Sequence, residues 1–296
     1  MKNLTALLRK HVPLARIPLS NGGWNFVAKK RVAFDAAILA YKFLNLCKTD
    51  DVGTLERCMD DLLVKCVRFE VEPFLVLDGK DPPLKAKEVQ KRASARKKAT
   101  DRGAAVSLQP RKRHFQAMAR MCQRHGATVV HAPEEAELMC AQLVKQGECD
   151  LVISNDSDCL AAGASIVCRF DSSQAHYIDL PTALSAMTSK KHADRPFDEV
   201  AMAHMCVMLG NDFCSNIPRV GPQGVWKLFV EQGARTIDEA IAKGRTAKDA
   251  RFDLSKTKEI ESAKDDVLRI FLTGRQCDEI ETHEDGRGDE LSCTHA

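Results

Sequence analysis

The sequence predicts an α/β protein with a mostly parallel central sheet and helices on both of its faces. Short apolar runs typical of buried strands alternate with stretches of helical periodicity, in the order β-α-β, basic helices, β-α-β. After residue 197 the pattern becomes entirely helical. A chain of 296 residues can bury a sizeable core. We therefore expect one domain over residues 1–276, followed by a disordered acidic tail over 277–296.

The spacing of apolar residues indicates where the individual elements lie. Predicted strands cover 32–36, 73–77, 127–131, 151–154, 165–170 and 176–180, the last two as a pair. Predicted helices cover 41–46, 55–69, 84–99, 111–124, 133–147, 197–209 and 223–232, with shorter ones near Ile237 and Ile260. Pro133 is expected to open its helix, because proline is favoured in a first helical turn. The helix over 197–209 is apolar on nearly every side, so we expect it to be buried.

Positive charge is concentrated in one segment. Residues 80–124 contain 14 Lys and Arg against 3 Asp and Glu, a net charge of +11, whereas the remainder carries −8 and the whole chain +3. A basic segment beside an acidic body suits a partner that is itself a polyanion, and a solvated helix face is the alternative. The helix over 84–99 has few apolar residues and must lie on the surface or over an opening. Lys85, Arg92 and Arg96 share one face, since they are seven and then four residues apart.

The composition is that of an ordinary soluble globular protein, with 44% hydrophobic and 29% charged residues. No apolar stretch approaches the ~20 residues of a membrane helix, and the first residues, MKNLTALLRKH, hold too short an apolar core for a secretion signal. We expect an intracellular protein with no membrane partner. The 12 cysteines are scattered without a C-x-x-C pair, so free, buried cysteines are expected rather than disulfides or zinc.

Acidic residues recur where predicted strands end or helices begin: Asp35, Asp78, Glu135, Glu137, Asp156, Asp158 and Asp212. Carboxylates just past buried strands are directed at the carboxyl edge of a sheet, where open α/β sheets build their sites. Carboxylates that converge on one point repel strongly unless cations lie between them, and hard oxygen ligands suit Mg²⁺ or Mn²⁺. Two such ions with a phosphodiester between them make a hydrolase. One such acid alone is more often a turn former or helix cap, but their recurrence favours the metal site.

Local spacing bears on two pairs of these acids and on one turn. Asp156 and Asp158 face the same side if their segment is extended. Glu135 and Glu137 diverge by about half a turn on a regular helix, so they converge only if the first turn is irregular or the ion lies near the helix start. A helix that begins at Gly221-Pro222 has free N–H groups, which form either a phosphate-binding site or an ordinary helix start.

Taken together, these segments resemble the flap endonuclease (XPG-type) family of structure-specific 5′ nucleases. The match is carried by VAFDAAILAYKFL, FLVLDGKDPPLKAKEVQKR, APEEAEL with SNDSDCL, and MLGNDF followed by IPRVGP, in the family's order over residues 31–232. The resemblance implies the PIN-like 5′ nuclease fold, with a helical arch and a C-terminal helix–two-turn–helix region that binds DNA. Its parts would be the nuclease body (1–84 and 126–196), the basic arch (85–125) and the helical region (197–276).

The resemblance also implies residue roles. One Mg²⁺ would be held by Asp35, Asp78, Glu135 and Glu137; a second ion, or its water shell, by Asp156, Asp158 and Asp212, with Mn²⁺ as a substitute. Lys85 and Arg92 match basic residues that contact the scissile phosphate. Tyr41 matches an aromatic residue on which a base stacks, with plain packing as the alternative. The residues expected to grip nucleic acid are Arg96, Lys97, Arg219, Gly221, Gln223 and Lys227, with a K⁺ ion at the turn.

Three departures from the family pattern bear on the substrate. The family's initial Met-Gly-Ile-x-Gly-Leu is absent, since the chain starts MKNLTAL. Arg219 replaces the first glycine of a Gly-x-Gly turn, which argues against the K⁺ ion there. The stretch from Lys85 to Pro133 is short, which indicates a reduced arch.

The expected function is a Mg²⁺-dependent nuclease that cuts branched or flapped DNA in replication or repair. An RNA-degrading member of the superfamily, of the virus host-shutoff type, is the alternative that the departures allow. A non-catalytic module that binds branched nucleic acid is less favoured, because every carboxylate position is filled. We expect a monomer without a sliding-clamp motif, since the loose likeness at Gln223–Phe229 lies in the helical grip. Lys97-Lys98 with Arg111-Lys112-Arg113 resembles a nuclear signal, although nucleic-acid contact explains the same residues.

Overall fold

The computed structural model describes residues 3–80, 82–102, 107–217, 220–246 and 258–273. These residues form a seven-stranded sheet in the order β1-β7-β6-β5-β2-β3-β4. In that order the strands are Arg16–Pro18, His176–Ile178, Ile166–Cys168, Leu151–Ile153, Arg31–Asp35, Glu72–Leu77 and Thr128–His131. The strands from β6 to β4 are mutually parallel, whereas β7 pairs antiparallel with both β6 and β1. The predicted mostly parallel sheet is confirmed.

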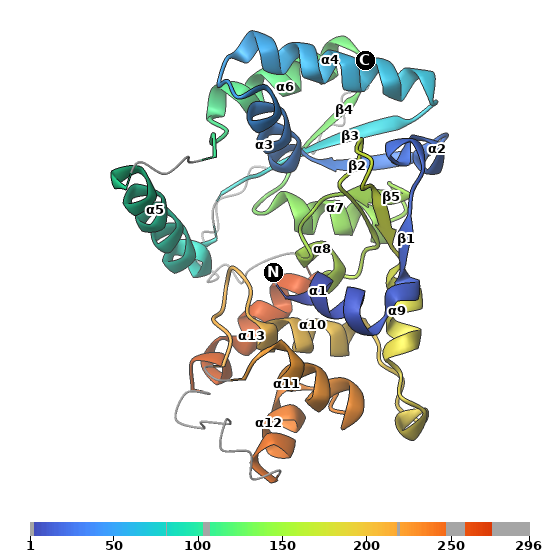
Figure 1. Cartoon of the computed structure of the whole chain (residues 1–296), viewed down its shortest axis with the longest axis vertical. Coiled ribbons are helices and arrows are strands. Elements are labelled where there is room, and N and C mark those ends of the chain that lie inside the picture. Colours follow the sequence, from blue (N-terminus) through green and yellow to red (C-terminus); the bar gives the residue numbers. More distant parts are fainter. Residues whose placement is uncertain (1–2, 81, 103–106, 218–219, 247–257, 274–296) are drawn as a thin grey trace, which may run out of the picture.

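Helices cover both faces of the sheet (Figure 1). On one face α3 (Ala36–Cys47), α4 (Val52–Arg68) and α6 (Lys112–Arg124) share a core with Val32 and Phe34 of β2. On the other face α7 (Ala136–Lys145) and α8 (Asp158–Ala161) share a second core with Ala33. Because strand side chains alternate between faces, the consecutive apolar residues of β2 contribute to both cores.

The chain after β7 is helical, as predicted. Its helices are α9 (Leu180–Met187), α10 (Glu199–Leu209), α11 (Pro222–Trp226) with a π-helical continuation over Lys227–Glu231, α12 (Ile237–Thr246) and α13 (Lys258–Thr273). Most of α10 is buried, but Val200 is 45% exposed and faces outward. The N-terminal helix α1 (Leu4–His11) packs against this region, where the His11 ring stacks on Trp226 with centroids 4.4 Å apart.

Several elements are not predicted by the apolar pattern. These are α1, β1, α2 (Trp24–Val27), α8 and α9. Three of them, β1, α2 and α8, have only three or four residues, too few for a periodic signal. The prediction that Pro133 opens a helix is wrong, because α7 begins at Ala136. Asp78 Oδ1 accepts the Ala136 N–H at 2.8 Å and thereby fixes the start of the helix there.

Helix α5 (Ala86–Asp101) stands apart from the body of the molecule (Figure 1) and follows a short helical turn at Pro83–Lys85. None of its residues is buried, as expected for a helix with so few apolar side chains. The second basic helix, α6, instead packs against α3 and α4 and buries one side, with Ala117, Met118, Met121 and Cys122. Of the two helices that the sequence groups at 85–125, only α5 projects like an arch.

The cysteines follow the expectation as far as the structure describes them. Those in the described residues are free, and most of them are buried. Cys47 is exposed and Cys58 is half-buried, with their sulfur atoms 3.6 Å apart. The tail over 277–296, predicted to be disordered, lies outside the described residues.

Gly79 lies where the end of β3 meets the loop that leads into α7. Its N–H donates to the Glu134 carbonyl at 2.6 Å, and a Cβ here would collide with the carbonyl oxygens of Ala132 and Pro133. We expect Gly79→Ala to displace this loop, and the adjoining Glu135 with it, and to lower the melting temperature by several degrees.

The matched control is Gly53→Ala in the first turn of α4, where a Cβ meets only the Asp51 carboxylate at 3.4 Å. Because alanine suits a helix better than glycine, this change should leave the melting temperature unchanged or raise it. Equal melting temperatures for the two variants in calorimetry would contradict the importance of the close approach at Gly79.

Candidate metal centre and nucleic-acid interface

Two acidic residues are fixed at the carboxyl ends of neighbouring strands. Asp35 ends β2, and its Oδ1 accepts the Ile38 N–H at 3.2 Å at the start of α3. Its Oδ2 accepts the Ser154 hydroxyl at 3.1 Å. Asp78 follows β3 directly and binds the first N–H of α7. These bonds hold both carboxylates at the sheet edge, against the starts of two helices.

Glu135 and Glu137 converge because only one of them is helical. Glu135 has extended backbone angles (φ −89°, ψ 130°) and precedes α7, whereas Glu137 lies in its first turn. The half-turn divergence of a regular helix therefore does not apply. Carboxylate oxygens of Asp78, Glu135 and Glu137 lie within 4.8 Å of one another. The sequence allowed convergence either through an irregular first turn or through an ion near the helix start, and the structure shows the irregular turn.

Asp156 and Asp158 converge through a turn. Asp158 begins α8, and its N–H donates to Asp156 Oδ1 at 3.0 Å. The segment is not extended at this pair, so the condition under which the sequence placed both acids on one side is not met. Oxygens of Glu137, Asp156 and Asp158 nevertheless lie within 4.8 Å of one another. Glu137 belongs to both acidic groups and links them into one centre.

Burial and mutual repulsion raise the pKa values of the central acids. Burial, reinforced by Asp78, raises the pKa of Asp35 to about 7. Burial and the charge of Asp156 raise the pKa of Asp158 to about 7, with a smaller contribution from Asp212. Burial and Glu135 raise the pKa of Glu137 well above its usual range, and Asp35 adds to this. Asp35 and Asp212 belong to neither group of converging oxygens, but the charge of Asp35 acts on Glu137 and the charge of Asp212 acts on Asp158, so both residues border the centre.

Two basic residues face the centre from the side of α5. Lys85 pairs with Glu135 and lies 3.7 Å from Asp212 Oδ2. Arg92 pairs with the other oxygen of Asp212, at 2.5 Å. Burial alone would lower the pKa of Lys85, but Glu135 and Glu137 outweigh burial and raise it. The common partner, Asp212, confirms that Lys85 and Arg92 point to the same side.

A cleft of about 750 Å³ lies between α3 and α5, and Tyr41, Arg92 and Arg96 line it. The Tyr41 hydroxyl donates to Gln109 Oε1 at 2.5 Å, and Arg96 Nη1 donates to the same oxygen at 3.3 Å. Tyr41 is 38% exposed, so the cleft leaves its ring accessible, and packing into a core does not describe it. Lys97 is exposed on α5 but does not line the cleft.

Of the other residues expected to bind nucleic acid, Gly221, Gln223 and Lys227 lie in or next to α11. Arg219 lies outside the described residues. Gly221 precedes α11, which has five residues before its π-helical continuation. Gln223 Oε1 lies 3.0 Å from His11 Nε2, a hydrogen bond that links α11 to α1, and Lys227 is exposed. A phosphate-binding site at Gly221 stays a prediction.

Two residues of the strand-end loop were missed at the level of sequence. Ser154 donates its hydroxyl to Asp35 and accepts the Asp156 N–H at 3.0 Å, so it orients two acids. Asn155 Oδ1 accepts the Arg169 N–H at 2.7 Å. The signal that could have found both is their position, since they separate a buried strand from Asp156 in the segment SNDSD.

Comparison with known proteins agrees with this geometry. The XPG N-terminal domain matches residues 2–99, and the XPG I-region matches residues 126–212. The chain belongs to the flap endonuclease (XPG) family. The two matched regions of this XPG-family chain contain all seven acidic residues that the sequence singled out.

Relatives of this XPG-family chain include both curated proteins and solved structures. Flap endonuclease 1 of Leishmania braziliensis is 26% identical over 231 residues, covering 67% of this chain and 57% of that protein. Flap endonuclease 1 of Glycine max is 26% identical over 276 residues, covering 83% and 70%. The catalytic core of Rad2 in complex with DNA substrate has a TM-score of 0.67 at 18% identity, over 93% of this chain and 87% of that one, and this likeness shows the fold. The chain spans little more than half the length of the Leishmania protein.

The donor set of the centre fits a hard divalent cation. Each acidic group offers three carboxylate oxygens, and no sulfur or imidazole belongs to either of these groups of described residues. Oxygen donors of this kind suit Mg²⁺-like ions, whose charge would relieve the repulsion among the acids. As a separate finding, none of the helices in the described ranges is both long and apolar enough to cross a bilayer.

The raised pKa values predict how stability depends on pH in the absence of metal. The pKa values of Asp35 and Asp158 are raised to about 7 in the folded protein, against 3.8 for a free aspartate. The folded state therefore binds more protons than the unfolded state between these values, and its stability falls as pH rises through about 7. In EDTA we expect a melting temperature several degrees lower at about pH 8 than at about pH 5.5, and recovery on adding Mg²⁺ at the higher pH.

The Asp35→Asn variant should show a smaller loss between these two pH values, because its side chain cannot ionise. Asp179→Asn, at the cap of α9, is the control and should keep the full loss. A melting temperature in EDTA that rises from about pH 5.5 to about pH 8 would contradict the raised pKa values.

Proposed function

We propose that this chain is a Mg²⁺-dependent, structure-specific 5′ nuclease that hydrolyses phosphodiester bonds in branched or flapped DNA. The observation that carries the proposal is the pair of acidic groups that share Glu137 and face Lys85 and Arg92. Membership of the flap endonuclease family supports it, as does the fold shared with a Rad2 core solved on DNA. Replication or repair is the process, and the nucleus the location, that this proposal predicts.

The acidic groups suggest how two Mg²⁺ ions, or Mn²⁺ in their place, would be held. Asp78, Glu135 and Glu137 would hold one ion, and Asp156 and Asp158 the other, with Glu137 shared. Asp35 and Asp212 would support the ligands and their water shells. When bound, such a pair of ions activates a water and stabilises charge on the phosphate and the leaving oxygen. The protein holds the carboxylates in place beforehand through backbone N–H groups, so they need little reorganisation.

Lys85 and Arg92 would contact the scissile phosphate. Without nucleic acid they pair with Glu135 and Asp212, between α5 and the sheet edge. A phosphate that enters here would compete with these carboxylates for both cations. The planar guanidinium of Arg92 can bind two phosphate oxygens at once, whereas Lys85 acts as a point charge. Tyr41, in the adjoining cleft, offers an accessible ring on which an unpaired base can stack.

Recognition by this site would depend on the shape of the nucleic acid. The residues proposed to grip its backbone are Arg96, Lys97, Arg219, Gly221, Gln223 and Lys227, with a K⁺ ion at the Gly221 turn as a further proposal. Contacts to phosphates position a duplex without reading its bases, so branch geometry rather than sequence would select the substrate.

RNA is the second candidate substrate. The arch consists of one helix of 16 residues, and the group that Arg92 on this helix would contact is a phosphate, which RNA also carries. A 2′-hydroxyl is what distinguishes RNA from DNA at a protein site, and none of the proposed contacts depends on it. The two substrates must therefore be compared directly.

The decisive experiment incubates the purified protein with a 5′-flap duplex in Mg²⁺ or in EDTA. Cleavage is expected in Mg²⁺ only, and a lack of cleavage in Mg²⁺ would end the proposal. Asp156→Ala should slow cleavage by about 10³-fold or more, because the variant loses a metal ligand. Its affinity for the flap should stay within a few-fold of the wild-type value, because it keeps every phosphate contact. Asp60→Ala, at a surface ion pair with His125, is the control. Faster cleavage of the same flap made of RNA would change the substrate class.

A second prediction separates positioning of the phosphate from attraction to the polyanion. Lys85→Ala and Arg92→Ala should each lower the single-turnover rate by about 10- to 100-fold, with affinity changed by no more than about threefold. Lys98→Ala removes an exposed charge from the same helix and should leave the rate unchanged. A loss confined to affinity in Lys85→Ala or Arg92→Ala would count against their contact with the reacting phosphate.

A further inference from the structure

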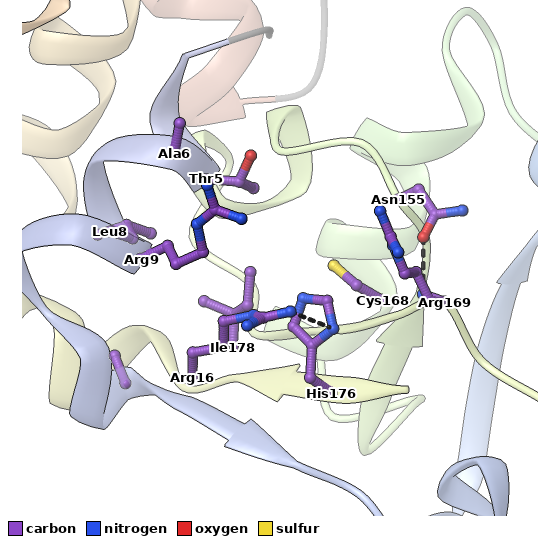
Figure 2. Close-up of a pocket in the computed structure, with 11 residues that line it drawn as sticks. Thr5, Ala6, Leu8, Arg9, Arg16, Asn155, Cys168, Arg169, His176 and Ile178 are labelled. Carbon is purple, nitrogen blue, oxygen red and sulfur yellow. Dashed lines mark hydrogen bonds between the residues drawn. The ribbon is translucent and has the colours of Figure 1, made fainter. Parts of the chain in front are cut away.

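A second, strongly basic pocket lies beside the strand-end loop (Figure 2). Its volume is about 480 Å³, and its walls come from α1, β1 and the β6–β7 hairpin. The polar residues that line it are Thr5, Arg9, Arg16, Asn155, Arg169 and His176. Among the described residues, no acidic side chain lines this pocket.

The three arginines of the pocket have no counter-ion within the described part of the chain. Arg9 and Arg169 are exposed and Arg16 is half-buried, and no described carboxylate pairs with any of them. Arg16 Nη2 instead lies 3.4 Å from His176 Nδ1. Like charges around one cavity repel one another, and an anion bound between them would relieve that repulsion. A role in holding the fold together does not explain this arrangement, whereas binding of an anion does.

His176 completes the pocket without adding to the repulsion. It is 8% exposed and projects into the cavity from β7 (Figure 2). Burial lowers its pKa, and the charges of Arg16 and Arg169 act in the same direction. The ring is therefore neutral near pH 7, and it contributes a polar wall beside the arginines.

The backbone of Arg169 is held in an unusual conformation. Its φ is 50°, in the left-handed region that favours glycine. Its N–H donates to Asn155 Oδ1, which ties the start of the β6–β7 connection to the loop that carries Asp156. Residues that keep such a conformation are found preferentially at functional sites, because the surrounding structure must enforce it.

Asn155 also connects the basic pocket with the candidate metal centre. It lines this pocket, an adjoining cavity of about 450 Å³ and the cleft between α3 and α5. Charges from both sites act on the thiol of Cys168, which lines the basic pocket. Burial raises the pKa of its thiol to about 12, Arg16 and Arg169 oppose this, and Asp156 adds to it. Asn155 therefore adjoins both the basic pocket and the cleft that Arg92 lines.

We propose that Arg9, Arg16 and Arg169 bind a backbone phosphate of the nucleic-acid substrate, on the side of the metal centre away from the arch. The proposal rests on the nuclease function proposed above. The sheet order supports the direction, because β6, β7 and β1 lie on one side of β5, whereas the arch follows β3 on the other side.

The chemistry of the pocket selects a phosphate rather than a base. Guanidinium groups match phosphate oxygens with paired hydrogen bonds. Of the described residues that line the pocket, only His176 carries a ring on which a base could stack. A strand held here and at Lys85 and Arg92 would have a fixed register across the acidic centre, and register determines which bond lies at the metals.

The test replaces phosphates of a flap duplex, one at a time, by neutral methylphosphonates and measures binding in EDTA at several salt concentrations. For the wild type, one replacement on the side of the cleavage site away from the arch should weaken binding about tenfold. The double variant Arg9→Gln, Arg16→Gln should bind the unmodified duplex about tenfold more weakly, ignore that replacement, and lose about one or two units of salt slope. Lys10→Gln, also on α1 but outside the pocket, should behave as the wild type does.

Melting temperature separates binding from a structural role. Because the arginines repel, the double variant should melt at or above the wild-type temperature, and a large decrease in both this variant and Arg9→Gln would indicate a structural role and overturn the proposal. Should the double variant not fold, Arg9→Gln alone, at an exposed position, carries the same test with a smaller effect.

The remaining outcomes distinguish this proposal from the nuclease function. A variant with wild-type affinity, salt slope and methylphosphonate response would overturn the pocket and leave the nuclease function standing. If the wild type shows the phosphate dependence but cuts nothing in Mg²⁺, the phosphate-binding pocket would stand and the nuclease function would be overturned. Stabilisation of the wild type by inorganic phosphate, with no loss of duplex affinity in the double variant, would assign the pocket to a free anion and overturn the proposal.

Discussion

The close approach of buried carboxylates is the constraint around which the molecule is organised. Acids whose oxygens lie within 4.8 Å of one another repel, and burial adds to the cost of their charge. Backbone N–H groups at the starts of α7 and α8 hold Asp78 and Asp156, and one at the start of α3 holds the bordering Asp35. The two apolar cores on either side of the sheet supply the stability that keeps this edge assembled.

Positive charge lies on two sides of the acidic centre. On one side Lys85 and Arg92 pair with Glu135 and Asp212, and on the other three arginines surround a pocket that Asn155 connects to the centre. Helix α5 contributes to this arrangement because it has no apolar face and cannot pack into a core. Its contacts with the body, such as Arg92 with Asp212 and Arg96 with Gln109, are polar, and phosphates can replace contacts of this kind.

Sequence reasoning succeeded where the signal is local and failed where long-range contacts decide the backbone. The buried strands β2, β3 and β5 are short apolar runs, and the acids that follow them were visible as such. The sequence left the backbone geometry of Glu135 open, and it considered Asp158 only for an extended segment. Glu135 stays extended because Asp78, from another strand, fixes the start of α7 one residue later. Asp158 is helical because α8 starts there, although the two-residue spacing suggested an extended segment.

The sequence by itself determined the fold class, the acids of the centre and the surface position of the basic helix, because each depends on the pattern of neighbouring residues. Only the tertiary structure decided that Glu137 joins both acidic groups and that Arg9, Arg16 and Arg169 meet at one pocket. More than 100 residues separate Arg16 from Arg169 in the chain, and they come together only because β1, β7 and β6 are neighbours in the sheet. The periodicity of the sequence does not reveal this proximity, because it depends on which strands pair and not on the neighbours of each residue along the chain.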